Sequence, residues 1–171
     1  MLEGEIIKHK VFVPLNEEAS KIHEEFYIGK KLQNYLVLSL IEALYLFDKG
    51  ILKIKLNGKE ISREEFIKYA QKYEHRFLVK YKVYKDLRER GCYIGTGYKF
   101  GSEFRVYERG QKPIKGKVHS KWVCYPVKPE DKFTLYEFSA KIRVAHSTRK
   151  KLLIAIVKDK IKYIEIEWRR M

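Results

Sequence analysis

The chain has 171 residues, of which 45% are hydrophobic and 14% aromatic, so it can bury a core as one domain or as two small ones. Its 37 Lys and Arg outnumber 22 Asp and Glu by 15, and this surplus indicates a polyanionic partner such as nucleic acid, although a heat-adapted surface is also rich in charge. No apolar run is long enough to span a membrane and no secretory signal opens the chain, so we expect a soluble, cytoplasmic protein.

The first part of the chain predicts a small α/β domain. Residues 1–13 alternate weakly and predict one or two short edge strands before Pro14. Asn16 is a favourable cap for a helix that ends at about residue 26. Apolar side chains recur at helical spacing over residues 36–49, which predicts a buried helix, and Gly50 stands where a left-handed cap belongs.

Local turn and cap signals continue this pattern. Residues 51–56 alternate between apolar residues and lysine, as in a half-buried strand, and Asn57-Gly58 is the favoured two-residue hairpin turn. Ser62, three residues before a glutamate, predicts a capping box at the start of a helix. A second helical run covers residues 76–90.

Strand-like patterns dominate after this second helical run. Strands are predicted at residues 92–96, 104–108, 119–128, 152–157 and 161–168, with a helix over residues 135–147. The predicted fold class is therefore α+β. A small N-terminal α/β domain over residues 1–76 is followed by a C-terminal mixed-sheet, nuclease-like α/β domain over residues 77–171.

The two cysteines, Cys92 and Cys124, lie far apart and lack the spacing of metal ligands. We expect both to be small buried hydrophobic residues rather than parts of a disulfide or a zinc site.

Groups that handle protons and phosphates are concentrated in two segments. The first, residues 95–120, contains Tyr98, Lys99, Arg105, Tyr107, Arg109, Lys115, Lys117 and His119. The second is residues 143–151, RVAHSTRKK. We interpret them as two walls of one RNA-cleaving site.

His119 differs from the other histidines in its setting. It follows a loop rich in lysine and glycine and begins a predicted strand, which leaves its ring exposed at a sheet edge. His9, His23 and His75 lack converging polar partners, and His146 ends a helix, where a cation is favourable. Of the five histidines, only His119 is therefore a candidate for acid–base chemistry.

A metal-dependent nuclease would need converging carboxylates. The available carboxylates show no such spacing; they are Glu103, Glu108, Asp131 and Asp159. The sequence instead favours cleavage without metal or cofactor, which suits RNA because its 2′-OH is the nucleophile.

Such cleavage requires a base for the 2′-OH, an acid for the leaving 5′-oxygen, and a cation over the charged phosphorane. His119 suits the acid, since imidazole has a reference pKa of about 6.5. A tyrosine is a base only where positive charge lowers its pKa. We expect Arg105 and Arg109 to lie on the strand face opposite Tyr107, which leaves Lys150 as the tuning cation.

Three stretches resemble one family. VYKDLRERGCYIGTGYKFGSEFRVYERG, then VHS, then RVAHSTRKKLLIAIV closely resemble the archaeal tRNA-splicing endonucleases, most strongly over residues 77–158. The upstream run LVLSLIEALYLFDKGILKI also resembles the family's amino-terminal domain. The resemblance therefore covers most of the chain.

The resemblance implies a catalytic triad and a substrate. Tyr107 of FRVYERG corresponds to the general base, His119 of VHS to the general acid, and Lys150, the first lysine of STRKK, to the stabilising cation. The implied substrate is the bulge–helix–bulge of precursor tRNA, cut without a metal ion to a 2′,3′-cyclic phosphate and a 5′-hydroxyl.

The resemblance also implies residues that clamp an extruded base. Arg143 matches the family's clamping arginine, and a second group comes from Trp168 or Arg169. Stacking on guanidinium or indole faces is an expected way to hold an unpaired base. Ordinary sheet packing is the alternative role for Trp168.

Family members assemble with two active sites related by a two-fold axis. Pairing of carboxyl-terminal strands, here residues 161–168, and an acidic loop, here Pro129-Glu130-Asp131, supply the contacts. A homotetramer is the first choice, and a heterotetramer with a structural subunit is the alternative.

Two other functions fit parts of the sequence. One is a non-catalytic RNA-binding subunit, which would not need all three triad residues. The other is a metal-dependent nuclease on a related sheet, which would cut DNA that lacks a 2′-OH.

Overall fold

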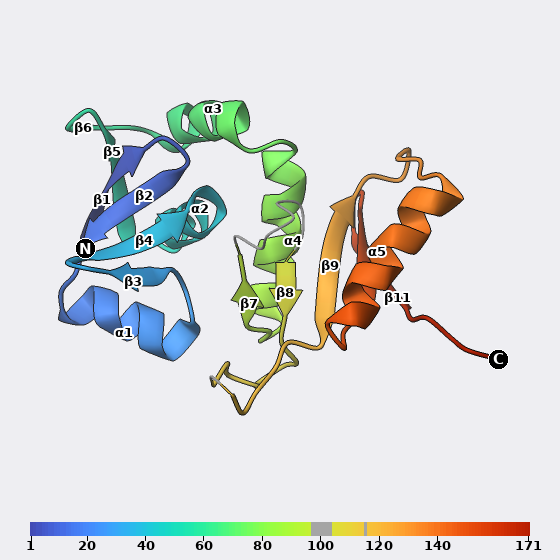
Figure 1. The fold of residues 1–171 in the computed structure, drawn as a ribbon. Coiled ribbons are helices and arrows are strands. Elements are labelled where there is room, and N and C mark those ends of the chain that lie inside the picture. The colour runs from blue at the N-terminus through green and yellow to red at the C-terminus, as the bar shows by residue number, and fades with distance from the viewer. Residues whose placement is uncertain (97–103, 115) are drawn as a thin grey trace. The chain divides into compact units, whose positions relative to one another are not determined.

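The computed structural model describes residues 1–96, 104–114 and 116–171 (Figure 1). The chain divides into two compact units, Met1–Tyr81 and Lys82–Met171. Each unit has a mixed sheet and helices, which confirms the predicted fold class. The domain boundary between residues 76 and 77 stays a prediction.

The amino-terminal unit is built on a six-stranded sheet. Its strands are β1 (Leu2–Ile7), β2 (Lys10–Pro14), β3 (Lys30–Leu32), β4 (Tyr35–Ser39), β5 (Leu52–Leu56) and β6 (Lys59–Glu60). Their order is β3-β4-β2-β1-β5-β6, with β1 and β5 parallel and the other pairs antiparallel. The prediction of edge strands at the amino terminus is therefore wrong, because β1 and β2 lie inside the sheet.

Three helices belong wholly to this unit: α1 (Glu17–Phe26), α2 (Leu40–Asp48) and α3 (Arg63–Tyr73). The side chain of Asn16 accepts a hydrogen bond from the Ala19 amide at 2.8 Å, and Ser62 forms the predicted capping box. Asn57 and Gly58 both have positive φ, as a tight hairpin turn between β5 and β6 requires. These predictions from local signals are confirmed.

The prediction of one helix over residues 36–49 is wrong in its first part. Tyr35–Ser39 forms β4, and α2 begins only at Leu40, with Ser39 as its N-cap. The carboxylate of Glu42 accepts from the amides of Ser39 and Gly29. A buried strand followed by a buried helix gives one continuous apolar run, so periodicity does not reveal the boundary.

The carboxyl-terminal unit begins within helix α4 (Phe77–Glu89) and also contains α5 (Leu135–Ser147). In its described part, five strands form a sheet of order β11-β10-β9-β8-β7. The strands are β7 (Ile94–Gly95), β8 (Phe104–Val106), β9 (Trp122–Val127), β10 (Lys151–Val157) and β11 (Ile161–Ile166). β9 and β10 are parallel and are joined by α5, the crossover connection that a parallel pair requires, whereas the other pairs are antiparallel.

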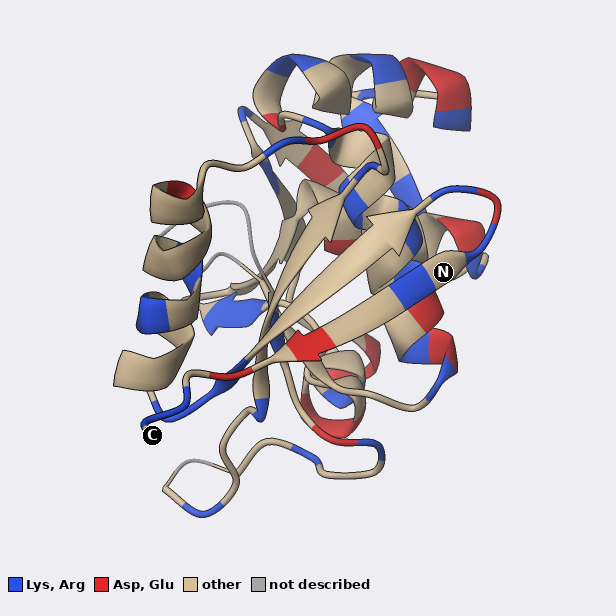
Figure 2. Cartoon of the chain, turned by 90° about the vertical axis from the view of Figure 1, so that its right-hand side faces the viewer, with Lys and Arg blue, Asp and Glu red and all other residues tan. Residues whose placement is uncertain are grey.

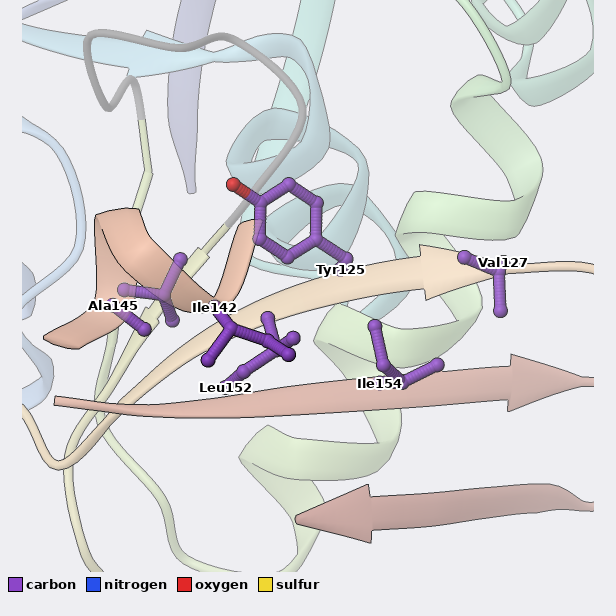
Figure 3. Close-up of a cluster of buried hydrophobic side chains, with 7 residues drawn as sticks. Tyr125, Val127, Ile142, Ala145, Leu152 and Ile154 are labelled. Atoms are coloured by element: carbon purple, nitrogen blue, oxygen red, sulfur yellow. The ribbon is translucent and has the colours of Figure 1, made fainter. Parts of the chain in front are cut away.

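The core of this unit lies between the sheet and α5 (Figure 3). The buried side chains are Val123, Tyr125 and Val127 of β9, Leu152 and Ile154 of β10, and Ile142 and Ala145 of α5. The strand β8 contacts α4 through its first residue, because the Phe104 ring lies 5.9 Å from that of Tyr84. Phe104 therefore points to the α4 side of the sheet.

Both cysteine thiols are free, with Cys124 fully buried and Cys92 half-buried. Burial raises the pKa of each thiol, and the prediction of a buried residue is confirmed for Cys124 but only in part for Cys92. Across the described ranges, no helix has both the length and the apolar character that crossing a membrane requires.

Candidate active site

The predicted catalytic residues lie next to the ends of three neighbouring strands, on the same side of the carboxyl-terminal sheet as seen along the strand direction. Tyr107 directly follows β8, His119 lies three residues before β9, and Lys150 directly precedes β10. Because β8 is antiparallel to β9 and β9 is parallel to β10, the end of the first strand lies beside the starts of the other two. The fold thus brings together the segments of Tyr107 and Lys150, which are 43 residues apart in the chain, with that of His119 between them in sequence.

Backbone hydrogen bonds fix these segments to one another. The Lys121 amide donates to Val106 O at 2.9 Å, and the Lys151 amide donates to Lys121 O at 3.0 Å. The Lys150 amide donates to Ala145 O at 2.8 Å, which ties the start of β10 to the end of α5. The backbone on either side of Lys150, and the backbone that follows His119, are therefore tied to the ends of regular elements.

The side chain of Lys150 extends toward the segment that carries His119. Its Nζ donates to the carbonyl oxygen of Ser120 at 3.3 Å. Partial burial, and then the positive charge of Arg105, lower the pKa of Lys150 from its ordinary value. No carboxylate in the described residues forms an ion pair with Lys150. Among the described residues, the charge of Lys150 is therefore not balanced by a carboxylate.

The two other predicted catalytic residues differ in burial. Tyr107 is only 6% exposed, and its amide donates to Tyr93 O at 2.9 Å. His119 is exposed. A phenol held in the sheet edge and an imidazole open to solvent suit a fixed base and an accessible acid.

The expectation that Arg105 lies on the strand face opposite Tyr107 is wrong. Side chains alternate along an extended strand, so residues two apart lie on the same face. Phe104 and Val106 of β8 are buried on one side, which places Arg105 and Tyr107 on the other. Arg105 therefore belongs to the same side of the sheet as the candidate base.

The predicted base-clamping residues lie on two other elements. Arg143 is exposed on α5, whereas Trp168, which is 46% exposed, and Arg169 follow β11. Since Ile166 pairs with Leu152, the chain leaves β11 at the edge where β10 begins. Figure 2 shows Lys and Arg in the segment after α5 and in the carboxyl-terminal tail. In the described part of the chain, no hydrogen bond or ion pair joins these side chains to the predicted triad.

A polar network beside these strand ends was not predicted. Trp122 Nε1 donates to Glu165 Oε1 at 3.0 Å, and Lys151 Nζ lies 3.6 Å from Glu165 and 3.2 Å from Glu167. Lys121 Nζ lies 2.8 Å from a Glu108 oxygen and 4.8 Å from the Trp122 ring centre. These contacts depend on strand register, which no local sequence signal provides.

The carboxylates considered as metal ligands have other partners or positions. Glu108 pairs with Lys121, and Asp131 accepts from the Lys128 amide at 2.8 Å within a turn. Of the residues placed in the structure, no three His, Cys, Asp or Glu side chains come together as ligands. Four candidate residues lie outside the described residues; they are Tyr98, Lys99, Glu103 and Lys115.

Comparison with known proteins gives matches over both units. The profile of the tRNA intron endonuclease catalytic C-terminal domain matches residues 77–164, and that of the N-terminal domain matches residues 2–67. A tRNA-splicing endonuclease of Nanoarchaeum equitans (strain Kin4-M) is 54% identical over 137 residues, which cover 78% of this chain and 89% of that protein.

Other archaeal relatives match almost the full length. A tRNA-splicing endonuclease of Methanothermobacter thermautotrophicus is 39% identical over 171 residues, covering 99% of this chain and 98% of the relative. A tRNA-splicing endonuclease of Thermococcus onnurineus is 36% identical over 169 residues, which cover 98% of this chain and 96% of the relative. These matches confirm the resemblance read from the sequence. The chain belongs to the tRNA-splicing endonuclease family and has both the N-terminal domain and the catalytic C-terminal domain of that family.

Proposed function

We propose that this protein is a metal-independent RNA endonuclease that excises introns from precursor tRNA by cutting bulge–helix–bulge junctions. The observation that carries the proposal is that the ends of β8, β9 and β10 meet at one sheet edge in a chain of this family. We further propose that it acts in the cytoplasm on its precursor RNA.

The proposed reaction uses RNA's own nucleophile. Tyr107, as phenolate, takes the proton of the 2′-OH, and the 2′-oxygen attacks the adjacent phosphorus. His119, as imidazolium, gives its proton to the 5′-oxygen as the P–O5′ bond breaks. The ammonium of Lys150 stabilises the negative charge that develops on the phosphorane. The products are a 2′,3′-cyclic phosphate and a 5′-hydroxyl, with protons balanced and no water consumed.

The same proposal assigns substrate binding to the side chains around this edge. Arg143 and either Trp168 or Arg169 stack on an extruded bulge base, since guanidinium and indole faces bind any nucleobase through its π-face. The exposure of all three side chains is compatible with this role.

We also propose that two or more copies assemble, with a homotetramer as the first choice and a heterotetramer as the alternative. β11 is an edge strand in the described sheet, and Ile164 on it is 45% exposed. The turn at Pro129-Glu130-Asp131 has an exposed acidic side chain at Glu130, suited to a basic surface on a second copy, whereas the Asp131 carboxylate accepts from the Lys128 amide within the turn. Light scattering of the pure protein measures the assembly directly.

The test is incubation of the protein alone with an intron-containing precursor tRNA in EDTA, followed by identification of the end groups. We expect cleavage that leaves a cyclic phosphate and a 5′-hydroxyl. His119→Ala is expected to slow cleavage by about 10²- to 10⁴-fold. His9→Ala, which removes an exposed imidazole from a turn of the other unit, is the matched control and should cleave normally.

Four results would contradict the proposal or part of it. Loss of wild-type cleavage in EDTA, or cleavage of DNA that lacks every 2′-OH, would indicate a metal-dependent nuclease. Tight binding of bulged RNA without cleavage would indicate a non-catalytic binding subunit. An unchanged rate in the His119→Ala variant would remove that residue from the mechanism.

A further inference from the structure

Arg105 is a basic residue on the same sheet face as Tyr107 to which no role has yet been given. Its partner across the strand pair is Val123, which packs against Ile142 and Ala145 of α5. Cross-strand partners share a face. Arg105 therefore stands on the α5 side of the sheet, between the core and the edge where β8 ends.

Gly95 provides the surface on which the guanidinium of Arg105 rests. The two residues are partners in the β7–β8 pair. A Cβ at Gly95 would lie 2.8 Å from Nη2, 3.0 Å from Nε and 3.1 Å from Cζ of Arg105. Gly95 does not have positive φ, so glycine is required here for space and not for backbone conformation. The guanidinium is thus held flat against the strand.

This held cation acts on Lys150. The positive charge of Arg105 is one of two causes that lower the pKa of Lys150, the larger being partial burial. Two like charges at a partly buried site repel each other, and a bound anion relieves that repulsion. A guanidinium presents a planar pair of donors that matches phosphate oxygens, while an ammonium acts as a point charge.

We propose that Arg105 is a further substrate-binding residue, whose guanidinium, seated on Gly95, binds a phosphate oxygen of the RNA backbone next to the phosphate held by Lys150. The inference rests on the proposed function, because it needs the scissile phosphodiester to lie at this edge. It adds a second cation to the site and assigns Gly95 the role of positioning it.

Binding of an RNA with a single 2′-deoxy nucleotide at the cleavage site separates affinity from cleavage. Arg105→Gln is expected to weaken this binding about 10- to 100-fold at low salt. It should also lower the slope of log affinity against log salt by about one, because one phosphate contact is lost. Arg105→Lys keeps the charge and should restore part of the affinity and the slope. Lys68→Gln removes an exposed positive charge from α3 and should leave both unchanged.

Gly95→Ala tests the position of the guanidinium without removing its charge. The added methyl group displaces the flexible end of Arg105, and the strand backbone accepts alanine, so the fold should be retained. We expect weaker RNA binding in this variant. Adding Gly95→Ala to Arg105→Gln should cause no further loss, because both changes act on the same contact.

Several outcomes would overturn the inference. Arg105→Gln with wild-type affinity and salt slope would do so. If Arg105→Gln and Arg105→Lys weaken RNA binding equally, lower the thermal midpoint and leave the slope of log affinity against log salt unchanged, Arg105 has a structural role instead. The His119→Ala variant separates the two proposals. If it is inactive while Arg105→Gln binds normally, only the inference fails; if it cleaves normally, the role proposed for His119 fails whatever Arg105 does.

Discussion

Replacing Lys150 by Gln should affect cleavage and stability in opposite directions. In the proposed reaction the ammonium stabilises the phosphorane, and removal of one preorganised charge of this kind costs about 10²- to 10³-fold in rate, or about 3–4 kcal/mol. The fold, in contrast, holds this charge in a partly buried position close to the charge of Arg105. The ammonium gains one long hydrogen bond, 3.3 Å to Ser120 O, in return.

The stability gain should be small because the ammonium is only partly buried. Solvent screening limits the relief to about 1 kcal/mol or less. For a chain of this length, that raises the thermal midpoint by at most about 2–4 °C. Single-turnover cleavage of a bulged precursor RNA and calorimetry of the same samples measure the two effects. Lys68→Gln is the control for loss of an exposed lysine.

The reasoning is refuted if Lys150→Gln melts several degrees lower than the wild type and its activity falls in proportion to the folded fraction. Lys150 would then be a structural residue. Normal cleavage by a variant of normal stability would refute its catalytic role as well.

Two further predictions concern pH and helix capping. The pKa of Lys150 is lowered below 10.5 in the folded state, so unfolding takes up protons and the stability of the wild type rises as pH rises through the lowered pKa. The stability advantage of Lys150→Gln over the wild type, measured by thermal unfolding, should therefore shrink as pH approaches 10.5. An advantage that grows over this pH range would contradict the lowered pKa. Ser39→Ala removes the cap of α2, which is closed by the buried Glu42, and should lower the unfolding free energy by about 1–2 kcal/mol in urea titrations. Ser62→Ala, in an exposed capping box, should lower the unfolding free energy by less than Ser39→Ala does. Equal losses in the two variants would show that burial of the cap does not affect its contribution.

Local signals in the sequence identified the elements that local chemistry determines. The Asn57-Gly58 turn, the cap at Asn16 and the box at Ser62 are each formed by residues within a few positions of one another. The division between β4 and α2 was missed because both are buried and apolar. A serine followed three residues later by a glutamate, inside that run, was the available signal.

The pairing of strands that are far apart in the chain could not be predicted from local sequence patterns. The parallel contact of β1 with β5 joins strands separated by two helices, and it moved the first strands from the expected edge into the sheet. The same limit applies to the candidate site. Residues Tyr107, His119 and Lys150 were selected by their chemistry and by resemblance to a family, whereas the approach of Arg105 to Gly95 follows from register alone.

The parallel pairing of β9 and β10 has a consequence for length variation in this enzyme family. The connection between these strands leaves β9 at the far end of the sheet, passes through the turn after Val127 and returns along α5. An insertion in that turn can be accommodated away from the edge where the two strands begin. Loops of different length can therefore evolve there while the starts of β9 and β10 keep their register.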